Sequence, residues 1–285
     1  MALSIPSRSK INLYLKVLKR RPDRYHELET LFLPLDTPAD RVTLDFVDTP
    51  GIRVCSSLAG LPENLENLAG RAALAYADMA GIAPAWSIRI EKEIPVAAGM
   101  GGGSSNAAAV LRLLNRHYGK LSSEELADLA LTLGADVPFF LHGRAAIATG
   151  IGEVFHYPAG KLYAPPLLVV NPQFPVSAKW AYMNLDPEQI GEDSSGKLKR
   201  LINALRRNDP QGVADNLHND LAAALYRKFP LLAILRDFLL ENGALNAEIT
   251  GSGPSIFAVC ASPAERDELC RSLAGAFRAV TIFVN

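Results

Sequence analysis

The stretch PVAAGMGGGSSNAAAVLRLL, residues 95–114, decides how this chain is interpreted. Four glycines fall within five residues, two serines follow, and an apolar run with helical spacing begins near Ser105. Upstream, WSIRIEKEI at residues 86–94 alternates apolar and polar side chains, which predicts a strand. Glycines let backbone N–H groups turn inward, and a helix start offers unpaired N–H groups and the positive end of its dipole. The order strand, glycine loop, helix therefore favours a triphosphate site over a glycine-rich turn that binds nothing.

The loop lacks the signatures of other phosphate-binding devices. A P-loop requires a lysine after its second glycine, but glycine and serine stand there. The dinucleotide fingerprint G-x-G-x-x-G fails in both registers, because Ser104 or Asn106 replaces its third glycine. The protein-kinase signatures H-R-D and D-F-G are absent. A dinucleotide-dependent oxidoreductase is thus a poor explanation, and the loop would hold phosphate through backbone N–H groups and the hydroxyls of Ser104 and Ser105.

The N-terminal segment KINLYLKVL, residues 10–18, alternates strictly and predicts a strand with one buried face. The apolar side chains of this face are Ile11, Leu13, Leu15 and Val17. The opposite face would carry Lys10, Asn12, Tyr14 and Lys16.

Further strands are predicted at residues 28–35 and 41–47. A helix predicted over residues 64–80 should end at Gly81, and the helix after the glycine loop should run from Ser105 to about His117.

The next segment, residues 122–134, is expected to be a short helix whose Ser122 and Glu125 form a capping box. It leads into GADVPFFLHGRAAIATGIGE, residues 134–153, which is strand-like and interrupted by glycine.

A proline- and glycine-rich stretch from Gly152 to Pro166 marks a domain boundary. We expect a nucleotide-binding domain with the glycine loop at residues 1–160 and a second domain at residues 161–285. In the second half, the strand patterns LLVV, AEIT, SIFAVC and VTIFV alternate with helical patterns and predict an α+β domain with an antiparallel sheet. The last strand could also return to the N-terminal domain.

The composition is that of an ordinary globular protein, with 285 residues, 49% hydrophobic residues and 21% charged residues. The net charge of −1 argues against nucleic acid or an anionic membrane as the main partner. Three distant cysteines contain no metal-binding pair, and neither a signal peptide nor a membrane-spanning run is expected. A cytoplasmic enzyme acting on a small molecule is the resulting expectation, as a monomer or homodimer.

A phosphoryl transfer also needs a group that deprotonates the acceptor and a cation that offsets charge. Asp136, which precedes the apolar run PFFL, is the best carboxylate for a base, although an aspartate at a helix end is an equally good explanation. Lys10 is the best cation, although a lysine at a strand start is often only solvated. If the two side chains meet, each favours the charged form of the other.

Other candidates lie in two turns. Tyr25 and His26 follow the turn RRPD and could stack on a base and read its edge, or belong to a plain surface loop. The pair Asn219–Asp220 is a further candidate, as is TGSGPS, residues 250–255, a glycine-rich connection between two strands.

Together these segments resemble the GHMP kinase superfamily of small-molecule kinases. PVAAGMGGGSS, residues 95–105, fits its phosphate-loop pattern P-x-x-x-G-x-G-[SG]-S-[SA]. Within the superfamily, the chain is most similar to the 4-diphosphocytidyl-2-C-methyl-D-erythritol kinase family of the non-mevalonate isoprenoid pathway. The similarity rests on KINLYLKVLKRRPDRYHELET, GMGGGSSNAAAVL, GADVPFFLHGRAAIATGIGE and TGSGPSIFAV, and covers the chain from end to end.

The resemblance implies a two-domain α+β fold, with an N-terminal domain like ribosomal protein S5 domain 2 and a C-terminal ferredoxin-like domain. It implies ATP with Mg²⁺, and a catalytic base at Asp136 partnered by Lys10, both directed at the C2 hydroxyl of the methylerythritol. The ATP phosphates would lie on Pro95, Val96, Ala97, Ala98, Gly99, Met100, Gly101, Gly102, Gly103, Ser104 and Ser105. The cytidine substrate would contact Asn12, Tyr25, His26, Ser177, Tyr182, Gly251, Ser252 and Gly253.

In this resemblance Tyr25 stacks on cytosine, His26 reads its polar edge, and Tyr182 completes the sandwich. The chain departs from the family at Ala178, where a threonine is common, and Ser177 could substitute for it. No carboxylate stands out as a Mg²⁺ ligand. Two alternatives remain: a GHMP kinase for another small alcohol, such as mevalonate, homoserine or a sugar, and a non-catalytic nucleotide-binding module of the same fold.

Overall fold

The structure is a computed structural model, and it describes residues 2–186, 190–191 and 196–285. The chain forms two compact units that interleave along the sequence. The first unit comprises Met1–Ser9, Pro38–Val96 and Gly101–Arg144, and the second comprises Lys10–Thr37, Ala97–Met100 and Ala145–Asn285. The sequence-based division at residue 160 treats the domains as consecutive, whereas these units share the two long strands β1 (Ala2–Arg20) and β2 (His26–Phe46).

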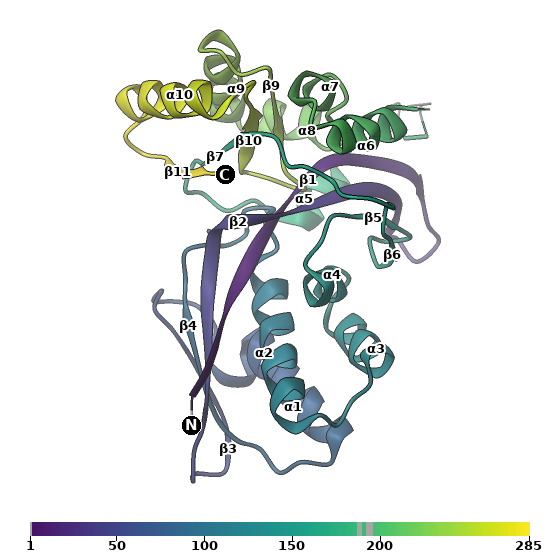
Figure 1. Cartoon of the computed structure of the whole chain (residues 1–285), viewed down its shortest axis with the longest axis vertical. Coiled ribbons are helices and arrows are strands. Elements are labelled where there is room, and N and C mark those ends of the chain that lie inside the picture. Colours follow the sequence, from purple (N-terminus) through teal and green to yellow (C-terminus); the bar gives the residue numbers. More distant parts are fainter. Residues whose placement is uncertain (1, 187–189, 192–195) are drawn as a thin grey trace. The chain divides into compact units, whose positions relative to one another are not determined.

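The first unit packs helices against a sheet in which β4 lies between β3 and β2. This strand pairs in parallel with β3 and antiparallel with the second half of β2, and Trp86, Ile88 and Ile90 on its inner face are buried. Helix α1 packs on α2, and α2 packs on α3 and α4 (Figure 1). The elements of this unit other than β1 and β2 are β3 (Gly51–Ser56), the 3-10 turn η1 (Asn64–Glu66), α1 (Leu68–Ala80), β4 (Ala85–Glu91), α2 (Gly102–Tyr118), α3 (Ser123–Leu133) and α4 (Val137–His142).

The second unit contains a separate antiparallel sheet of order β11-β7-β10-β9, with helices α9 and α10 packed on it. Here β1 pairs in parallel with the short β8, and β2 pairs with β5, which pairs with β6. The elements are β5 (Ala146–Thr149), β6 (Val154–His156), β7 (Leu167–Asn171), α5 (Ala178–Met183), α6 (Lys197–Arg207), α7 (Pro210–Ala214), β8 (His218–Asn219), α8 (Ala222–Lys228), α9 (Pro230–Glu241), β9 (Asn246–Ile249), β10 (Ile256–Val259), α10 (Pro263–Ala276) and β11 (Thr281–Val284).

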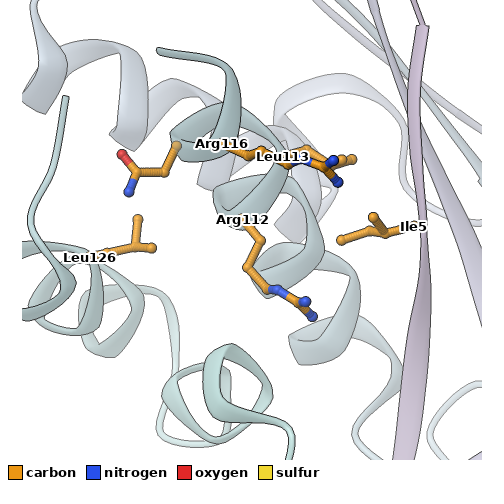
Figure 2. Close-up of a pocket in the computed structure, with 6 residues that line it drawn as sticks. Ile5, Arg112, Leu113, Arg116 and Leu126 are labelled. Atoms are coloured by element: carbon orange, nitrogen blue, oxygen red, sulfur yellow. The ribbon is translucent and has the colours of Figure 1, made fainter. Parts of the chain in front are cut away.

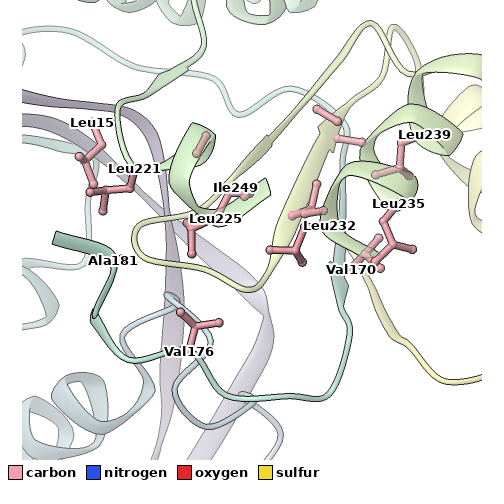
Figure 3. Close-up of a cluster of buried hydrophobic side chains, with 14 of the residues drawn as sticks. Leu15, Val170, Val176, Ala181, Leu221, Leu225, Leu232, Leu235, Leu239 and Ile249 are labelled. Atoms are coloured by element: carbon pink, nitrogen blue, oxygen red, sulfur yellow. The ribbon is translucent and has the colours of Figure 1, made fainter. Parts of the chain in front are cut away.

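The core of the second unit is a cluster of aliphatic side chains from strands and helices. Leu232, Leu235 and Leu239 lie on one side of α9, as their spacing of three and four residues requires. They enter the same cluster as Val170 of β7 and Ile249 of β9 (Figure 3). This packing holds the antiparallel sheet in place. The turn between strands β9 and β10 of this sheet forms part of the candidate site.

Several predicted elements match the structure. Helix α1 ends at Gly81, which has a left-handed backbone with φ of 65°, and α3 begins with the capping box of Ser122 and Glu125. In the second half, β7, β9, β10 and β11 form the predicted antiparallel sheet. The last strand pairs with β7 in the second unit rather than returning to the N-terminal domain.

Two strand predictions are corrected. The strands predicted at residues 28–35 and 41–47 form one continuous strand, β2, which ends at Phe46 and contains Pro34 and Pro38. Proline cannot donate to a strand ladder. On one side of β2, residues 30–32 pair with β5 and residues 41–46 pair with β4, so both prolines lie between these paired stretches.

The predicted one-sided burial of β1 is also wrong. Every residue from Ser9 to Val17 is buried, including Lys10 and Lys16. Polar side chains cover the second face and give its charged groups partners, which an alternating sequence pattern does not reveal.

The segment at residues 134–153 is only partly strand. Residues 137–142 form the helix α4, with a proline in its first turn, and strand begins at Ala146. Proline is favoured in a first helical turn, and a short apolar run such as VPFFL has no periodicity that separates helix from strand. Helix α2 also begins three residues earlier than predicted, at Gly102.

None of the helices in the described part of the chain combines the length and the apolar run that spanning a membrane requires.

Candidate active site

Lys10 of β1 lies with its ammonium group against the glycine loop. Its Nζ donates hydrogen bonds to Asn12 Oδ1 at 2.7 Å and to the Gly99 carbonyl at 2.8 Å, and it lies 5.0 Å from the centre of the Phe32 ring. Only 4% of Lys10 is exposed. The side chain of Asn12 is itself fixed, because its Nδ2 donates to Thr30 Oγ1 at 2.8 Å. The structure therefore places a buried cation at a fixed position beside Gly99.

The turn between β9 and β10 lies against Asn12, Gly99 and the Lys10 ammonium group. The Asn12 N–H donates to Thr250 Oγ1 at 3.0 Å, and that hydroxyl lies 3.3 Å from both Asn12 Oδ1 and the Gly99 carbonyl. A Cβ on Gly99 would lie 2.2 Å from the Thr250 carbonyl, and one on Gly251 would lie 3.1 Å from Asn12 Oδ1 and 3.5 Å from Lys10 Nζ. A larger residue at either position would crowd these neighbours, so both positions require glycine. The absence of a side chain at Gly251 lets the turn lie close to Lys10 and Asn12.

Asn219 of β8 holds the same turn from its other side. Its Nδ2 donates to the carbonyls of Ile249 at 2.7 Å and Gly251 at 2.8 Å, and its Oδ1 accepts from the Leu221 N–H. Asn219 and Thr250 belong to the two segments already named as further candidates, whereas Thr30 was not predicted. A hydroxyl or amide that serves only to position others has no sequence pattern of its own.

The glycine loop has a backbone suited to an anion. Ala97, Gly99 and Gly101 have positive φ values of 49°, 75° and 73°, and they alternate with Ala98 and Met100. Such alternation turns successive N–H groups toward one side, which makes a concave anion site. The first hydrogen bond inside α2 joins the Ser105 N–H to the Gly101 carbonyl, so the N–H groups of residues 102–104 precede the helical ladder.

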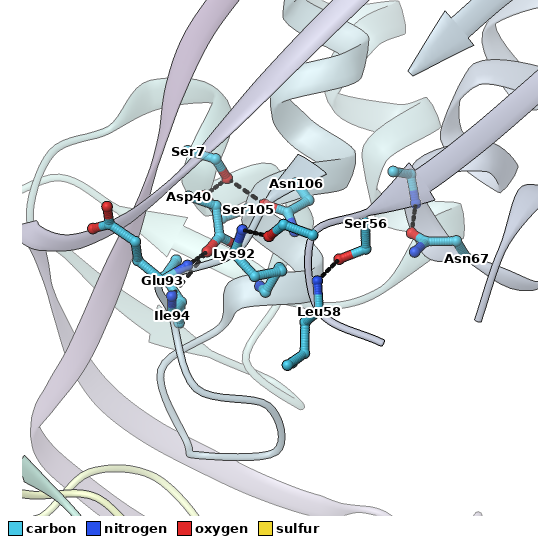
Figure 4. A network of polar contacts seen from close by, with 12 residues as sticks. Ser7, Asp40, Ser56, Leu58, Asn67, Lys92, Glu93, Ile94, Ser105 and Asn106 are labelled. Carbon is cyan, nitrogen blue, oxygen red and sulfur yellow. Dashed lines mark hydrogen bonds and ion pairs between the residues drawn. The ribbon is translucent and has the colours of Figure 1, made fainter. Parts of the chain in front are cut away.

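Two serines of the loop have different surroundings. Ser105 is buried, and its Oγ lies 2.7 Å from Ser7 Oγ, which is also 2.8 Å from Asn106 Oδ1 (Figure 4). The Ser105 hydroxyl, predicted to contact phosphate, therefore faces Ser7 of β1 inside the first unit. Ser104 is half-buried, so its hydroxyl is more accessible to a phosphate than that of Ser105.

A buried ion pair lies immediately before the loop. Asp40 of β2 pairs with Lys92, and its Oδ1 accepts the N–H groups of Glu93 and Ile94 at 2.8 Å each (Figure 4). The Lys92 ammonium reaches the first turn of α2, since a Cβ on Gly102 would lie 3.2 Å from its Nζ. Sequence reasoning missed this pair. Its one signal is a lysine directly before the loop, and its acidic partner lies 52 residues away.

Asp136 is the residue that precedes α4 in the first unit. It is half-buried, with φ of −80° and ψ of −15°, and its side chain does not cap the helix. Its predicted encounter with Lys10, which belongs to the second unit, stays a prediction.

Two of the residues predicted to bind the cytosine ring, His26 and Tyr182, lie against each other in the second unit. Tyr182 of α5 stacks on His26, with ring centres 5.5 Å apart and planes at 19°. Tyr25 is 61% exposed, in a turn where its N–H donates to Asp23 Oδ1 at 3.0 Å. Burial, and secondarily the charge of Arg20, lowers the pKa of His26 below its usual 6.5. Ser177 is exposed and caps α5 by accepting the Trp180 N–H.

Within residues 2–186, 190–191 and 196–285, no three His, Cys, Asp or Glu side chains gather where they could hold an ion. A divalent cation would need most of its ligands from elsewhere.

Comparisons with known proteins agree with the fold. The family models for the GHMP kinases N terminal domain and GHMP kinases C terminal match residues 67–144 and 201–279. The 4-diphosphocytidyl-2-C-methyl-D-erythritol kinase of Geobacter metallireducens is 39% identical over 275 residues, covering 95% of this chain and 94% of the relative. The corresponding kinase of Syntrophotalea carbinolica is 42% identical, covering 88% and 87%.

Solved structures give the same result. A crystal structure of 4-(cytidine 5'-diphospho)-2C-methyl-D-erythritol kinase matches with a TM-score of 0.83 and 34% identity, covering 99% of this chain and 98% of that one. A homoserine kinase from Cytophaga hutchinsonii has a TM-score of 0.79 but only 22% identity, which supports the shared fold alone. The predicted GHMP kinase fold is thereby confirmed. The chain belongs to the 4-diphosphocytidyl-2-C-methyl-D-erythritol kinase family of the GHMP kinases and is an ATP-dependent small-molecule kinase.

Proposed function

We propose that the chain transfers the γ-phosphoryl group of ATP to the C2 hydroxyl of 4-diphosphocytidyl-2-C-methyl-D-erythritol, in the non-mevalonate route to isoprenoids. Relatives and a solved structure that match nearly the whole chain carry the name of this kinase. The observation that carries the proposal is the Lys10 ammonium, bound to the Gly99 carbonyl at 2.8 Å and to Asn12 at 2.7 Å. It is a fixed positive charge beside a loop whose backbone is shaped for phosphate.

The proposed reaction gives each group a separate task. Residues 95–105 hold the ATP phosphates, mainly through N–H groups of the loop and of the first turn of α2. Asp136 accepts the proton of the C2 hydroxyl while the hydroxyl oxygen forms a bond to the γ-phosphorus of ATP. The bond between the γ-phosphorus and the bridging oxygen breaks, and ADP leaves. Lys10 offsets the negative charge that develops in this step.

The cytidine substrate is proposed to contact Asn12, Ser177 and the turn of residues 251–253, together with Tyr25, His26 and Tyr182. The lowered pKa of His26 keeps its ring neutral at pH 7, with one donor and one acceptor nitrogen. Such a ring suits the mixed donor and acceptor edge of cytosine. Because Tyr182 already stacks on His26, we propose that a base binds on an outer face of this pair or separates the two rings.

Mg²⁺ is proposed to accompany ATP, with its ligands drawn from phosphate oxygens and water, as this ion prefers. The protein would act as a monomer or homodimer in the cytoplasm, on a small molecule and not on nucleic acid or membrane.

A panel of acceptors in a coupled assay for ADP tests the proposal. We expect rapid ADP release with 4-diphosphocytidyl-2-C-methyl-D-erythritol and only background release with mevalonate, homoserine, galactose or no acceptor. Turnover of one of those simple alcohols instead would assign the chain to another GHMP activity. Tight ATP binding without ADP release in any reaction would make it a nucleotide-binding module.

A further inference from the structure

A pocket of about 290 Å³ opens in the first unit between β1, α2 and α3 (Figure 2). It is lined by Ile5, Arg112, Leu113, Asn115, Arg116 and Leu126. Arg112 follows Gly102, the first residue of α2, by ten positions. Since an α-helix rises about 1.5 Å per residue, the pocket lies roughly 15 Å along the helix from the glycine loop. It is therefore distinct from the proposed phosphate site.

Three of the six side chains that line the pocket are apolar. Ile5, Leu113 and Leu126, which line the pocket, come from three different elements, β1, α2 and α3 (Figure 2). Asn115 belongs to the wall rather than to the binding chemistry, because its amide is already engaged. Its Oδ1 accepts from Tyr76 Oη and the Leu121 N–H at 3.0 Å each, and its Nδ2 donates to the Leu121 carbonyl at 2.9 Å. The pocket is thus a preformed slot for an aliphatic group.

Two arginines add positive charge to this slot. Arg112 and Arg116 are one helical turn apart on α2, where like charges repel. Neither guanidinium has an ion-pair or hydrogen-bond partner among the residues that the structure describes. The dipole at the end of α2 favours Arg116, which lies in the last turn, but it does not extend to Arg112. An anion between the two side chains would relieve their repulsion.

We propose that this pocket binds a small organic anion, composed of a carboxylate or phosphate head on a short aliphatic chain. The head pairs with the guanidinium forks of Arg112 and Arg116, which match the geometry of either oxyanion. The aliphatic chain fills the slot between Ile5, Leu113 and Leu126. The volume is at the lower end for small-molecule sites, which restricts the ligand to a short chain.

Isothermal titration calorimetry with simple probes tests this assignment. The full chain is first saturated with a non-hydrolysable ATP analogue, so that the phosphate loop is filled. n-Hexyl phosphate and hexanoate then carry both required parts, hexan-1-ol carries only the chain, and inorganic phosphate carries only the head. We expect at least one of the charged amphiphiles to bind with 1:1 stoichiometry, at least tenfold more tightly than hexanol or inorganic phosphate. The better of the two identifies the preferred head group.

Variants assign the binding to this pocket. Arg112→Gln and Arg116→Gln should each weaken the charged amphiphile at least tenfold, whereas Arg53→Gln, at an exposed position on β3, should leave its affinity unchanged. Both pocket arginines are exposed, so circular dichroism should show unchanged folding. The proposal is overturned if neither amphiphile binds, if hexanol binds as tightly, or if the arginine variants retain full affinity.

Discussion

At the scale of single residues, the proposed chemistry depends on how one buried ammonium is held. Lys10 is almost inaccessible, and its ammonium group donates hydrogen bonds to the neutral oxygens of Asn12 and Gly99. A charge fixed in this way needs no reorganisation when negative charge develops on a transferring phosphoryl group. The sequence pattern put Lys10 on a polar strand face, but it could not reveal the burial. The residue that covers this face, Thr250, lies 238 positions after Asn12.

Asp136→Asn tests the proposed base. The substitution keeps the shape of the side chain but removes its capacity to accept a proton, so kcat should fall by about 10²–10⁴-fold. The affinity for ATP and the thermal unfolding temperature should change little. Steady-state kinetics and calorimetry measure both effects. Asp128→Asn, at an exposed position on α3, is the matched control and should be fully active. Activity of Asp136→Asn within a few-fold of the wild type would show that another group is the base.

At the scale of elements, two short connections contain residues of the candidate site. The turn between β9 and β10 lies in close contact with Lys10 and Asn12. The segment before α2 is held in place by the ion pair between Asp40 and Lys92. Their glycine patterns and lengths are visible in the sequence. The partners that fix them come from distant strands, and only the folded chain brings these together.

Gly251→Ala tests whether the β9–β10 turn positions Asn12. Gly251 has φ of 55°, so alanine there costs about 1–2 kcal/mol of backbone strain. The new methyl group would also lie 3.1 Å from Asn12 Oδ1, and kcat/KM should fall at least about tenfold. Gly81→Ala is a matched control, because Gly81 has φ of 65° but an added Cβ meets nothing within 4 Å. The control should lose similar stability and keep its activity. Equal kcat/KM in the two variants would refute a positioning role for the turn.

Asp40→Asn tests the anchor of the phosphate loop. It leaves the Lys92 ammonium without its buried carboxylate, so the free energy of unfolding should fall by about 3–5 kcal/mol, and the KM for ATP should rise. Asp45→Asn on the same strand breaks an exposed pair with Arg89 at 3.7 Å and should cost at most about 1 kcal/mol. Urea unfolding and ATP titration compare the two. An Asp40 variant as stable as the Asp45 variant would mean that the buried pair contributes little.

The predicted elements succeeded where a local signal was strong and failed where it was ambiguous. The capping box of α3 and the glycine that ends α1 identified two helices correctly. VPFFL was misjudged because five apolar residues show no period. The two strands predicted at residues 28–35 and 41–47 are one strand, β2, which continues through a stretch that lacks a partner on one side.

At the scale of the whole molecule, each unit has its own core, and its stability depends on groups outside the site. Glu248 of β9 is such a group. Burial raises the pKa of its carboxyl above the usual 4.5, against the opposing effects of the Ile249 N–H and the charges of Arg236 and His218. The folded protein therefore binds this proton more tightly than the unfolded chain does.

Glu248→Gln should change the pH dependence of stability in a defined direction. As pH rises from about 4.5 through the raised pKa, ionisation of Glu248 is harder in the folded state, so wild-type stability decreases. The neutral variant escapes this loss and should become progressively more stable than the wild type above pH 4.5. Urea unfolding at several pH values measures the difference, with Glu241→Gln at the exposed end of α9 as control. Parallel pH profiles for wild type and Glu248→Gln would contradict the assignment.

The overall fold could be predicted because several long motifs occur in the right order, and family resemblance then supplied the architecture. The interleaving of the two units could not be predicted from composition, since β1 and β2 pass through both of them and the proline-rich stretch at residues 152–166 lies wholly within the second unit. For the site, the glycine loop, Lys10, Asn12 and Gly251 could be named as candidates from the sequence. The structure brings Lys10, Asn12, Gly99 and Gly251 together, and their roles stay predictions. The packing of His26 on Tyr182 depends on tertiary structure alone.

The central claim concerns which hydroxyl receives the phosphate, and the proton-coupled ³¹P spectrum of the product tests it most directly. C2 of the methylerythritol carries a methyl group and no hydrogen, so a phosphate on its oxygen has no proton on the adjoining carbon. Incubation of the wild-type chain with ATP and 4-diphosphocytidyl-2-C-methyl-D-erythritol should therefore produce a new monoester signal that is a singlet. A doublet or triplet would place the phosphate on a secondary or primary hydroxyl, and the absence of any new monoester would contradict the proposed activity itself.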